Sequence, residues 1–226
     1  MRLNITTKAA LAGGEVKRGK LIVLEGIDGS GTTTQAKRLY RRLLQKGFKA
    51  SLTSEPSRGP AGKLIREYLS GEAKFLDRKL GANALALLFA ADRLDHLSSR
   101  INPLLQEGKM VVSDRYVLSS LAYQSLECDL DWVLKINRNA RPADLTLLLD
   151  LPAGTALKRV SRRGKSRELF EKLAIQKKVR ANYLKLAGKL GRAHGIVVIN
   201  GEKSSAEIQE EILKTVLTFL EGSGKS

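Results

Sequence analysis

Residues 20–35 read KLIVLEGIDGSGTTTQ, an apolar run followed by a glycine-rich turn and then by a helical pattern. The run 20–25 is rich in β-branched and aliphatic residues, so it predicts a buried strand. Residues 26–33 match the phosphate-loop pattern G-x-x-x-x-G-K-[ST] at every defined position except the lysine, where Thr32 stands. Glycines let the backbone turn tightly and aim its N–H groups at phosphate oxygens, and the following helix adds the partial positive charge of its N-terminus. The pattern therefore predicts a phosphate-binding loop between a strand and a helix.

Farther along the chain, short apolar runs alternate with amphipathic segments. The apolar runs predict four more strands, at 50–53, 110–113, 145–150 and 195–199. Apolar residues at helical spacing predict helices at 36–44, 61–69, 83–106, 155–163, 169–190 and 206–220. Apolar strands that alternate with helices are typical of a parallel sheet covered on both faces. We therefore expect an α/β fold of the P-loop NTPase type, with a five-stranded parallel sheet flanked by helices on both faces and a small helical lid.

The chain shows no internal repeat or linker, and its 226 residues suit one domain. We expect a loose, poorly ordered extension at 1–19, a single domain at 20–221 with its lid at about 162–170, and a short tail at 222–226. The N-terminal residues lack the sustained apolar run of a signal peptide, and no apolar run is long enough to cross a bilayer. A single cysteine excludes an internal disulfide. These features favour a cytoplasmic protein without a membrane segment.

The formal net charge of +17 and the pI near 10.1 indicate an anionic partner, either nucleic acid or the phosphates of nucleotides. A solvated basic surface is the plain alternative, since lysines and arginines are spread along nearly every predicted helix. No segment combines dense positive charge with interleaved aromatic residues, and aromatic residues make up only 5% of the chain. The composition therefore favours nucleotides over nucleic acid.

Polar residues follow two of the predicted strands. Asp114 and Arg115 end the strand at 110–113, where a doubly wound sheet places its ligand crevice. There an aspartate can hold Mg²⁺ through water or orient the phosphoryl acceptor, while the arginine can clamp a phosphate. The hydroxyl of Thr33 is a further candidate ligand of Mg²⁺. Glu55 and Arg58 follow the second strand in the same way. An ordinary surface ion pair remains the alternative for the Asp-Arg pair.

Two further groups point to a nucleotide. Phe89 and Arg93 lie four residues apart on one predicted helix, so they share a face and could present a stacking ring and a forked donor to a base. Four cations at 162–167 surround Gly164 between two helices. Such a run is usually solvated, but in a kinase it could form a mobile lid that closes over the phosphates.

Six segments together resemble the thymidylate kinase family over most of residues 20–220. They are LEGIDGSGTTTQ (24–35), TSEPSRG (53–59), LLFAADR (87–93), VSDRYVLSSLAYQ (112–124), RPADLTLLLDLP (141–152) and KKVRANYLKLA (177–187). FAADR and DRYVLSSLAYQ are more specific than the phosphate loop. The resemblance implies transfer of the ATP γ-phosphate to dTMP with Mg²⁺, in a homodimer packed through helices.

The resemblance also implies roles for individual residues. The residues expected to bind ATP are Gly26, Asp28, Gly29, Ser30, Gly31, Thr32, Thr33 and Thr34, and Mg²⁺ is expected at Thr33 and Asp114. The residues expected to bind the acceptor are Asp28, Glu55, Arg58, Phe89, Arg93, Arg115, Ser120, Tyr123 and Gln124. In the family pattern Phe89 stacks on thymine, Asp28 holds the 3′-hydroxyl, and Tyr123 favours a deoxysugar. The expected catalytic residues are Asp114, Arg115, Arg163 and Arg167.

Two departures from the family pattern concern catalysis. Thr32 replaces the lysine that bridges the phosphates, and Glu168-Leu169 stands where many members carry an Asp-Arg pair. Our hypothesis is that Arg163, Lys165 or Arg167 of the lid supplies the missing charge. The alternatives are a kinase for another pyrimidine monophosphate, a nucleotide-binding homologue that has lost catalysis, and a basic nucleic-acid binder.

Overall fold

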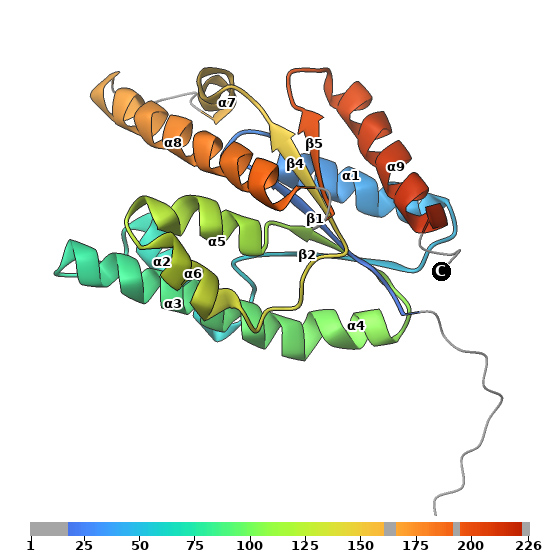
Figure 1. Cartoon of the computed structure of the whole chain (residues 1–226), viewed down its shortest axis with the longest axis horizontal. Helices are drawn as coiled ribbons and strands as arrows, with labels where there is room; N and C mark the ends of the chain where they lie inside the picture. The colour runs from blue at the N-terminus through green and yellow to red at the C-terminus, as the bar shows by residue number, and fades with distance from the viewer. Residues whose placement is uncertain (1–17, 161–165, 192–194, 223–226) are drawn as a thin grey trace, which may run out of the picture.

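Five parallel strands form one sheet in the order β2-β3-β1-β4-β5 (Figure 1). This computed structural model describes residues 18–160, 166–191 and 195–222, and of residues 160 and 166–171 only the helical backbone. The strands are β1 (Leu21–Gly26), β2 (Ala50–Ser54), β3 (Met110–Asp114), β4 (Leu145–Asp150) and β5 (Ile196–Asn200). The expected P-loop NTPase sheet is thereby confirmed, with β1 paired on both sides.

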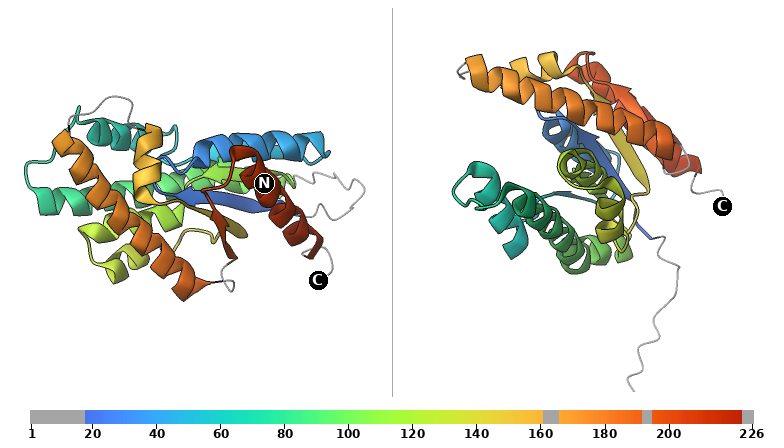
Figure 2. Two further views of the ribbon diagram at one scale, coloured as in Figure 1. Left: turned by 90° about the horizontal axis from the view of Figure 1, so that it is seen from above. Right: turned by 60° about the vertical axis from the view of Figure 1, so that its left-hand side comes forward.

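Helices cover both faces of this sheet (Figure 2). They are α1 (Thr32–Gln45), α2 (Pro60–Ser70), α3 (Arg78–His96), α4 (Asn102–Gln106), α5 (Val117–Tyr123), α6 (Leu130–Asn137), α7 (Ala153–Val160), α8 (Ser166–Leu190) and α9 (Ser205–Gly222). A π-helical turn, Leu97–Ile101, joins α3 to α4, and a 3₁₀ turn, Gln124–Leu126, follows α5.

Alternate residues of β1 face two separate parts of the core, as expected for a strand buried on both faces. Ile22 and Leu24 pack in a cluster with apolar residues of α1 and α9. Leu21 and Val23 pack on the other face, with residues of α4 and the π-helical turn. A third cluster joins α5, α6 and α8 to β4. The sheet is therefore the middle layer of three.

The carboxyl ends of β1, β3 and β4 lie side by side, and this edge positions the site. Leu24 of β1 pairs with Asp114 of β3, and Gly26 of β1 pairs with Leu149 of β4. The glycine-rich loop therefore leaves the sheet directly beside Asp114. This is the crevice in which open α/β sheets bind their ligands.

The helix predicted at 83–106 differs from the structure in two ways, each for a local reason. Helix α3 begins at Arg78, five residues before the predicted start, because the Asp77 side chain accepts from the N–H of Leu80 at 2.6 Å and caps the first turn. The predicted helix at 83–106 is also interrupted by the π-helical turn just before Pro103. Proline has no N–H and its ring clashes with the preceding turn, so the helix widens there.

Two short helices, α5 and α6, are absent from the sequence expectation. Helix α6 carries its own signal, since the Asp129 side chain accepts from the N–H of Trp132 at 2.8 Å. Helix α5 carries none, because no side chain at its own N-cap position caps it. Its capping carboxylate comes from Glu25, which is distant in sequence.

The chain ends partly fall outside the described residues. Gly19, which the sequence placed in the extension, is buried and donates its N–H to the carbonyl of Leu105 at 2.8 Å. Residues 1–17, 161–165, 192–194 and 223–226 are outside the described part, and they include the beginning of the lid predicted at about 162–170. Among the helices that are described, none is long and apolar enough to cross a membrane.

Candidate active site

The loop between β1 and α1 has the backbone geometry that phosphate binding needs. Gly29 and Gly31 have φ values of 85° and 99°, in the left-handed region that residues with side chains rarely adopt. The N–H of Ser30 donates to the carbonyl of Ile27 at 3.0 Å and closes the turn. Helix α1 begins at Thr32, and no side chain caps its N-terminus. Its first N–H groups are therefore available to the oxygens of an anion.

Thr33 and Asp114 meet at the first turn of α1. Thr33 Oγ1 donates to Asp114 Oδ2 at 2.5 Å, and Asp114 Oδ1 is buried without a hydrogen-bond partner among the described residues. A hydroxyl beside a carboxylate with a spare oxygen fits Mg²⁺, which takes one or two protein oxygens and fills its other positions with phosphate oxygens and water. Within the described part of the chain, no three His, Cys, Asp or Glu side chains form a metal-binding group. A metal held by Thr33 and Asp114 would take its remaining ligands from water or from a bound phosphate.

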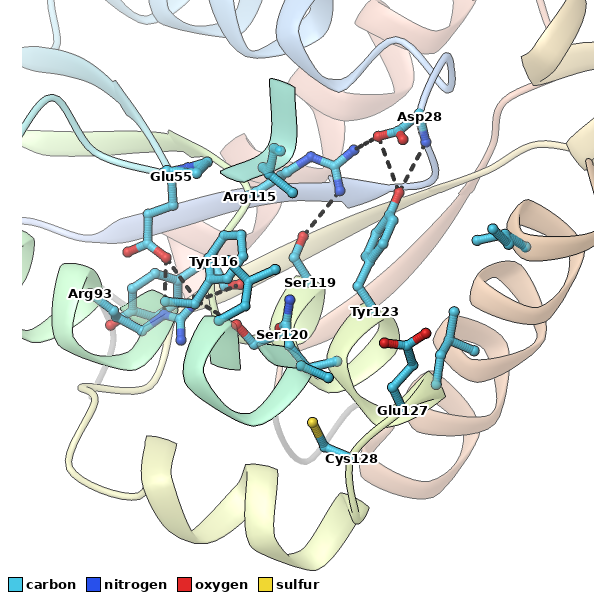
Figure 3. Close-up of a pocket in the computed structure, with 18 of the residues that line it drawn as sticks. Asp28, Glu55, Arg93, Arg115, Tyr116, Ser119, Ser120, Tyr123, Glu127 and Cys128 are labelled. Carbon is cyan, nitrogen blue, oxygen red and sulfur yellow. Dashed lines mark hydrogen bonds and ion pairs between the residues drawn. The ribbon is translucent and has the colours of Figure 1, made fainter. Parts of the chain in front are cut away.

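A cavity of about 520 Å³ opens beside this loop, lined mainly by α3 and α5 (Figure 3). Eight of the nine residues expected to bind an acceptor line it: Asp28, Glu55, Phe89, Arg93, Arg115, Ser120, Tyr123 and Gln124. They come from four separate segments of the chain. The fold thus gathers in one cavity residues that lie up to 96 positions apart, from Asp28 to Gln124.

One part of the cavity wall suits a flat ring. Leu85 and Phe89 lie four residues apart on α3 and both line the cavity. Gln124 lines it as well, and its Oε1 is buried without a hydrogen-bond partner among the described residues. A buried acceptor without a donor costs free energy until a ligand supplies one. This wall therefore suits a flat ring, and the Gln124 amide oxygen could accept from an N–H of that ring only if the side chain turned to uncover it.

Arg93 lies in the wall of the same cavity and is only 1% exposed. Its Nε donates to Glu55 Oε2 at 2.9 Å, and its Nη1 donates to Asn137 Oδ1. Its Nη2 donates to the carbonyl of Tyr116 at 3.2 Å and to Ser120 Oγ at 3.0 Å. Four of its five N–H groups are thus held by the protein. Arg93 mainly joins the walls of the cavity, and one N–H remains for a ligand.

Asp28 of the phosphate loop is held by side chains from three other segments, two of which, Arg115 and Tyr123, are drawn in Figure 3. Its Oδ1 accepts from Arg115 Nη2 at 2.7 Å and from the Tyr123 hydroxyl at 3.2 Å. Its Oδ2 accepts from Nε2 of Gln176 on α8 at 3.0 Å. The Arg115 guanidinium also lies 5.2 Å from the centre of the Tyr123 ring. The network joins the loop to α5 and α8 where the cavity meets the loop.

Arg115 has an unusual backbone conformation. Its φ is 70°, and it is the one non-glycine residue with positive φ among those described. An L-residue pays about 1 kcal/mol for this region, so the surroundings must hold it there. Its N–H donates to the carbonyl of Leu24 at 2.9 Å, and its own carbonyl accepts from Ser113 Oγ at 2.8 Å. Strained backbone conformations of this kind are common at functional sites, where a side chain must be held in one orientation.

Glu25 is the candidate residue that the sequence patterns did not single out. It lies near the end of β1, is fully buried, and contacts Ser119 and Tyr183. Burial raises the pKa of its carboxyl from 4.5 to about 7, although Ser119, Arg115 and Tyr183 each lower it. The one available signal was a charged residue at the end of an otherwise apolar run. Gln176 had no such signal, because it lies among other polar residues of a long helix.

Arg58 does not join the other residues expected to bind an acceptor. It is exposed and lines a second cavity of about 490 Å³, together with Thr33 and Asp114. Lys37 and Arg100 line this second cavity too. The expected contact between Arg58 and an acceptor phosphate stays a prediction.

The expected catalytic residues of the lid lie beyond what the structure describes. Arg163 and Lys165 are outside the described residues, and the side chain of Arg167, in the first turn of α8, is not described. Thr32 itself is buried at the start of α1. The hypothesis that lid cations replace the missing lysine therefore also stays a prediction.

Comparison with known proteins points to one family. The family described as Thymidylate kinase matches residues 24–212. A "Probable thymidylate kinase" of Pyrococcus horikoshii is 44% identical over 200 residues, which cover 88% of this chain and 96% of the relative. Proteins of the same name from Thermococcus kodakarensis and Methanococcus maripaludis are 41% and 43% identical, again over 88% of this chain and over 98% and 95% of the relatives. The similarity thus spans the sheet, the phosphate loop and the cavity.

Glu25 should make the fold less stable as the pH rises. Its folded-state pKa is raised from 4.5 to about 7, so its contribution is fully present below pH 4.5 and is lost as the pH rises through 7. Relative to Glu25→Gln, we expect the free energy of unfolding to fall by up to about 3 kcal/mol across this window. Urea denaturation of both proteins at several pH values measures this change. A difference that stays constant with pH would contradict it.

Proposed function

The chain belongs to the thymidylate kinase family, and we propose that it transfers the γ-phosphate of ATP to dTMP, giving dTDP and ADP. The observation that carries the proposal is the Arg115 guanidinium, which lines the cavity and binds Asp28 of the phosphate loop. One cation thus lies between a site for a ring and a site for a phosphate. This arrangement suits a reaction in which a nucleotide in the cavity receives a phosphoryl group at the loop. The dTDP would serve the synthesis of dTTP in the cytoplasm.

The proposed base site is the wall with Phe89 and Gln124. Thymine carries an N3–H donor, which matches the unpartnered Oε1 of Gln124, and a flat face, which matches the Phe89 ring. Arg93 Nη2 donates a hydrogen bond to Ser120 Oγ at 3.0 Å, and this contact helps to define the shape of the cavity wall. Arg93 therefore acts mainly by positioning, with a single N–H to offer the base.

The proposed sugar and phosphate site is the network around Asp28. Tyr123 and Asp28 share a hydrogen bond at the mouth of the cavity, where a 2′-hydroxyl would compete for space and a 3′-hydroxyl could be bound. Arg115 is fixed beside them and can pair with the acceptor phosphate. The phosphate of dTMP carries about −1.5 to −2 charges at pH 7, so its oxygen attacks without a general base. The work of these residues is alignment and charge neutralisation.

The proposed donor site is the loop at 26–33, with Thr33 and Asp114 holding Mg²⁺. The loop glycines and the first N–H groups of α1 would bind the phosphates of ATP. Bound Mg²⁺ would neutralise charge that develops on the transferred group. A lysine at position 32 would normally add a further positive charge, and we assign that task to Arg163, Lys165 or Arg167 of the lid.

We also propose that the protein is a homodimer through α3. Leu80, Leu87 and Leu94 are 69%, 49% and 40% exposed and lie seven residues apart, so they form one stripe along the helix. The opposite face of α3 carries cavity residues, among them Leu85 and Phe89. A stripe of exposed leucines on a well-formed helix is typical of a helix-packed interface.

The reaction is tested by dTDP formation from ATP and dTMP, with dUMP, UMP and CMP as competing acceptors. We expect dTMP to give the highest kcat/KM. Phe89→Ala should lower kcat/KM for dTMP about tenfold or more, since a stacked ring contributes about 1–3 kcal/mol. Leu44→Ala, on the exposed side of α1, serves as the control. Preference for another monophosphate would overturn the assigned substrate, and no turnover with any of them would overturn the assigned reaction.

Loss of the lid cations should slow the chemical step. In the triple variant Arg163→Ala, Lys165→Ala and Arg167→Ala we expect kcat to fall about 10²–10³-fold, which corresponds to about 3–4 kcal/mol of lost stabilisation. Adding Thr32→Lys to this variant should restore part of the rate, because it returns a cation to the loop. Lys189→Ala, at the far end of α8, is the matched control. Unchanged turnover in the triple variant would exclude the lid as the source of charge.

Charge placed in the leucine stripe should dissociate the dimer. We expect Leu87→Glu to be a monomer at micromolar concentration in size-exclusion chromatography with light scattering, because its carboxylate would be buried without a partner. Leu44→Glu changes a leucine of similar exposure, 44% against 49%, on α1 and should stay dimeric. A wild-type monomer, or a dimer that both variants retain, would contradict the α3 interface.

A further inference from the structure

Glu25 is a buried carboxylate that the proposed reaction does not use directly. It lies in β1 directly before the phosphate loop and has no exposed surface. Its Oε1 accepts from the N–H groups of Tyr116 at 2.9 Å and Ser119 at 3.2 Å. Its Oε2 accepts from the hydroxyls of Ser119 at 2.5 Å and Tyr183 at 3.0 Å. Four donors from two other segments therefore converge on one carboxylate.

Two of these contacts make Glu25 the cap of α5. The N–H groups of Tyr116 and Ser119 lie at the start of α5, where no side chain at the N-cap position accepts them. A carboxylate at a helix N-terminus satisfies such groups and interacts favourably with the helix dipole. Helix α5 carries Ser120 and Tyr123 into the cavity. The position of those two residues thus depends on the end of β1.

The other contacts lead from Glu25 to Arg115. Ser119 Oγ donates to Glu25 and accepts from Arg115 Nη1 at 3.3 Å (Figure 3). The second Nη of Arg115 binds Asp28, so the guanidinium is held from two sides. Because Arg115 also has a strained backbone, its side chain needs such restraints to keep one direction.

We propose that Glu25 is a positioning residue for the acceptor phosphate: its carboxylate fixes the start of α5 and, through Ser119, the direction of the Arg115 guanidinium. The proposal rests on the proposed function for the identity of the acceptor, a pyrimidine nucleoside monophosphate. It gives Glu25 no contact with that nucleotide. It predicts that Glu25 affects binding of the monophosphate and not of ATP.

The four contacts of Glu25 differ in whether their direction can reverse. All four partners can donate, and the two backbone N–H groups cannot change that role. The hydroxyls of Ser119 and Tyr183 can also accept, so a protonated Glu25, or the amide of Gln, would donate to one of them and rearrange the hydrogen bonds that lead to Arg115. The Tyr183 hydroxyl remains a donor, because burial raises its pKa well above the usual value.

The charged groups around Glu25 are few. Arg115, from the segment after β3, faces it and favours its ionised form, and Tyr183 approaches from α8. Asp28 and Tyr123 act on Arg115 from the phosphate loop and α5. Since burial raises the Glu25 pKa to about 7, its charge changes near neutral pH. Lowering the pH should therefore raise the free energy of unfolding through Glu25 and at the same time weaken the restraint on the Arg115 side chain. If Glu25 had only a structural role, protein stability and nucleotide affinity would change in the same direction.

The test is calorimetric binding of dTMP to the full-length protein between about pH 6 and pH 8, with binding of ATP measured in parallel. Near pH 8 we expect Glu25→Gln to weaken dTMP binding about tenfold, which is the loss of one charge-assisted hydrogen bond, and to leave ATP binding within about twofold. Near pH 6 the two proteins should bind dTMP almost equally. The titration of the dTMP phosphate is common to both proteins and cancels in their ratio.

Two further variants separate positioning from stability. Ser119→Ala breaks the link to Arg115 but keeps the backbone contacts of Glu25, so it should weaken dTMP binding in the same direction. Asp144→Asn is the matched control, because Asp144 accepts from the N–H of Leu21 at 2.8 Å at the opposite end of β1. It should lower stability without changing the affinity for dTMP.

The proposal is overturned if the ratio of dTMP affinities is independent of pH, or if ATP binding weakens equally. It also fails if wild-type protein binds no nucleoside monophosphate. The proposed function fails separately, when wild-type protein binds dTMP but forms no dTDP. Glu25→Asp keeps a carboxylate at this position. If Glu25→Asp binds dTMP more tightly than Glu25→Gln and its dTMP affinity again depends on pH, the carboxylate itself is the group that matters.

Discussion

A buried carboxylate must be given hydrogen-bond donors, and the carboxylate of Glu25 receives its four from α5, the segment before it, and α8. That requirement fixes how these segments sit against the end of β1. Because the phosphate loop begins at the next residue, the same contacts relate the loop to the cavity wall. The hydrogen bonds of the Glu25 carboxylate therefore set how the phosphate loop and the cavity wall lie relative to each other.

The two halves of the site are prepared to different degrees. On the cavity side the cations are already in place, since Arg93 and Arg115 are both held by hydrogen bonds to the protein. On the loop side the backbone is formed, but Thr32 offers only a neutral hydroxyl where a lysine is usual. The cavity side is thus preorganised, whereas on the loop side we propose that lid cations supply the charge of the missing lysine. Closure of the lid would then complete the site.

The exposed and buried faces of α3 connect this site to assembly. One face carries Phe89 and other cavity residues, and the other carries the stripe of Leu80, Leu87 and Leu94. A partner packed on that stripe would restrain the helix that forms one wall of the cavity. Dimerisation and the shape of the base site would then be linked through a single rigid element.

Local patterns in the sequence determined the sheet and the phosphate loop, and they pointed to five of the residues that line the cavity: Asp28, Glu55, Phe89, Arg93 and Arg115. The strand before Gly26, the loop glycines and the spacing of Phe89 and Arg93 are visible because each depends on neighbours along the chain. The resemblance to a family added Ser120, Tyr123 and Gln124, which no local pattern marks and which line the cavity. Only the tertiary structure showed that Arg93 is held mainly by the protein.

The tertiary structure also decided how α5 begins. Its cap is Glu25, which lies 91 positions before Tyr116, so no window of sequence contains both partners. The same holds for Gln176, which reaches Asp28 across 148 positions. Periodicity and turn chemistry act over a few residues and can be read directly. The satisfaction of buried charge acts through space, and it exists only once the chain has folded.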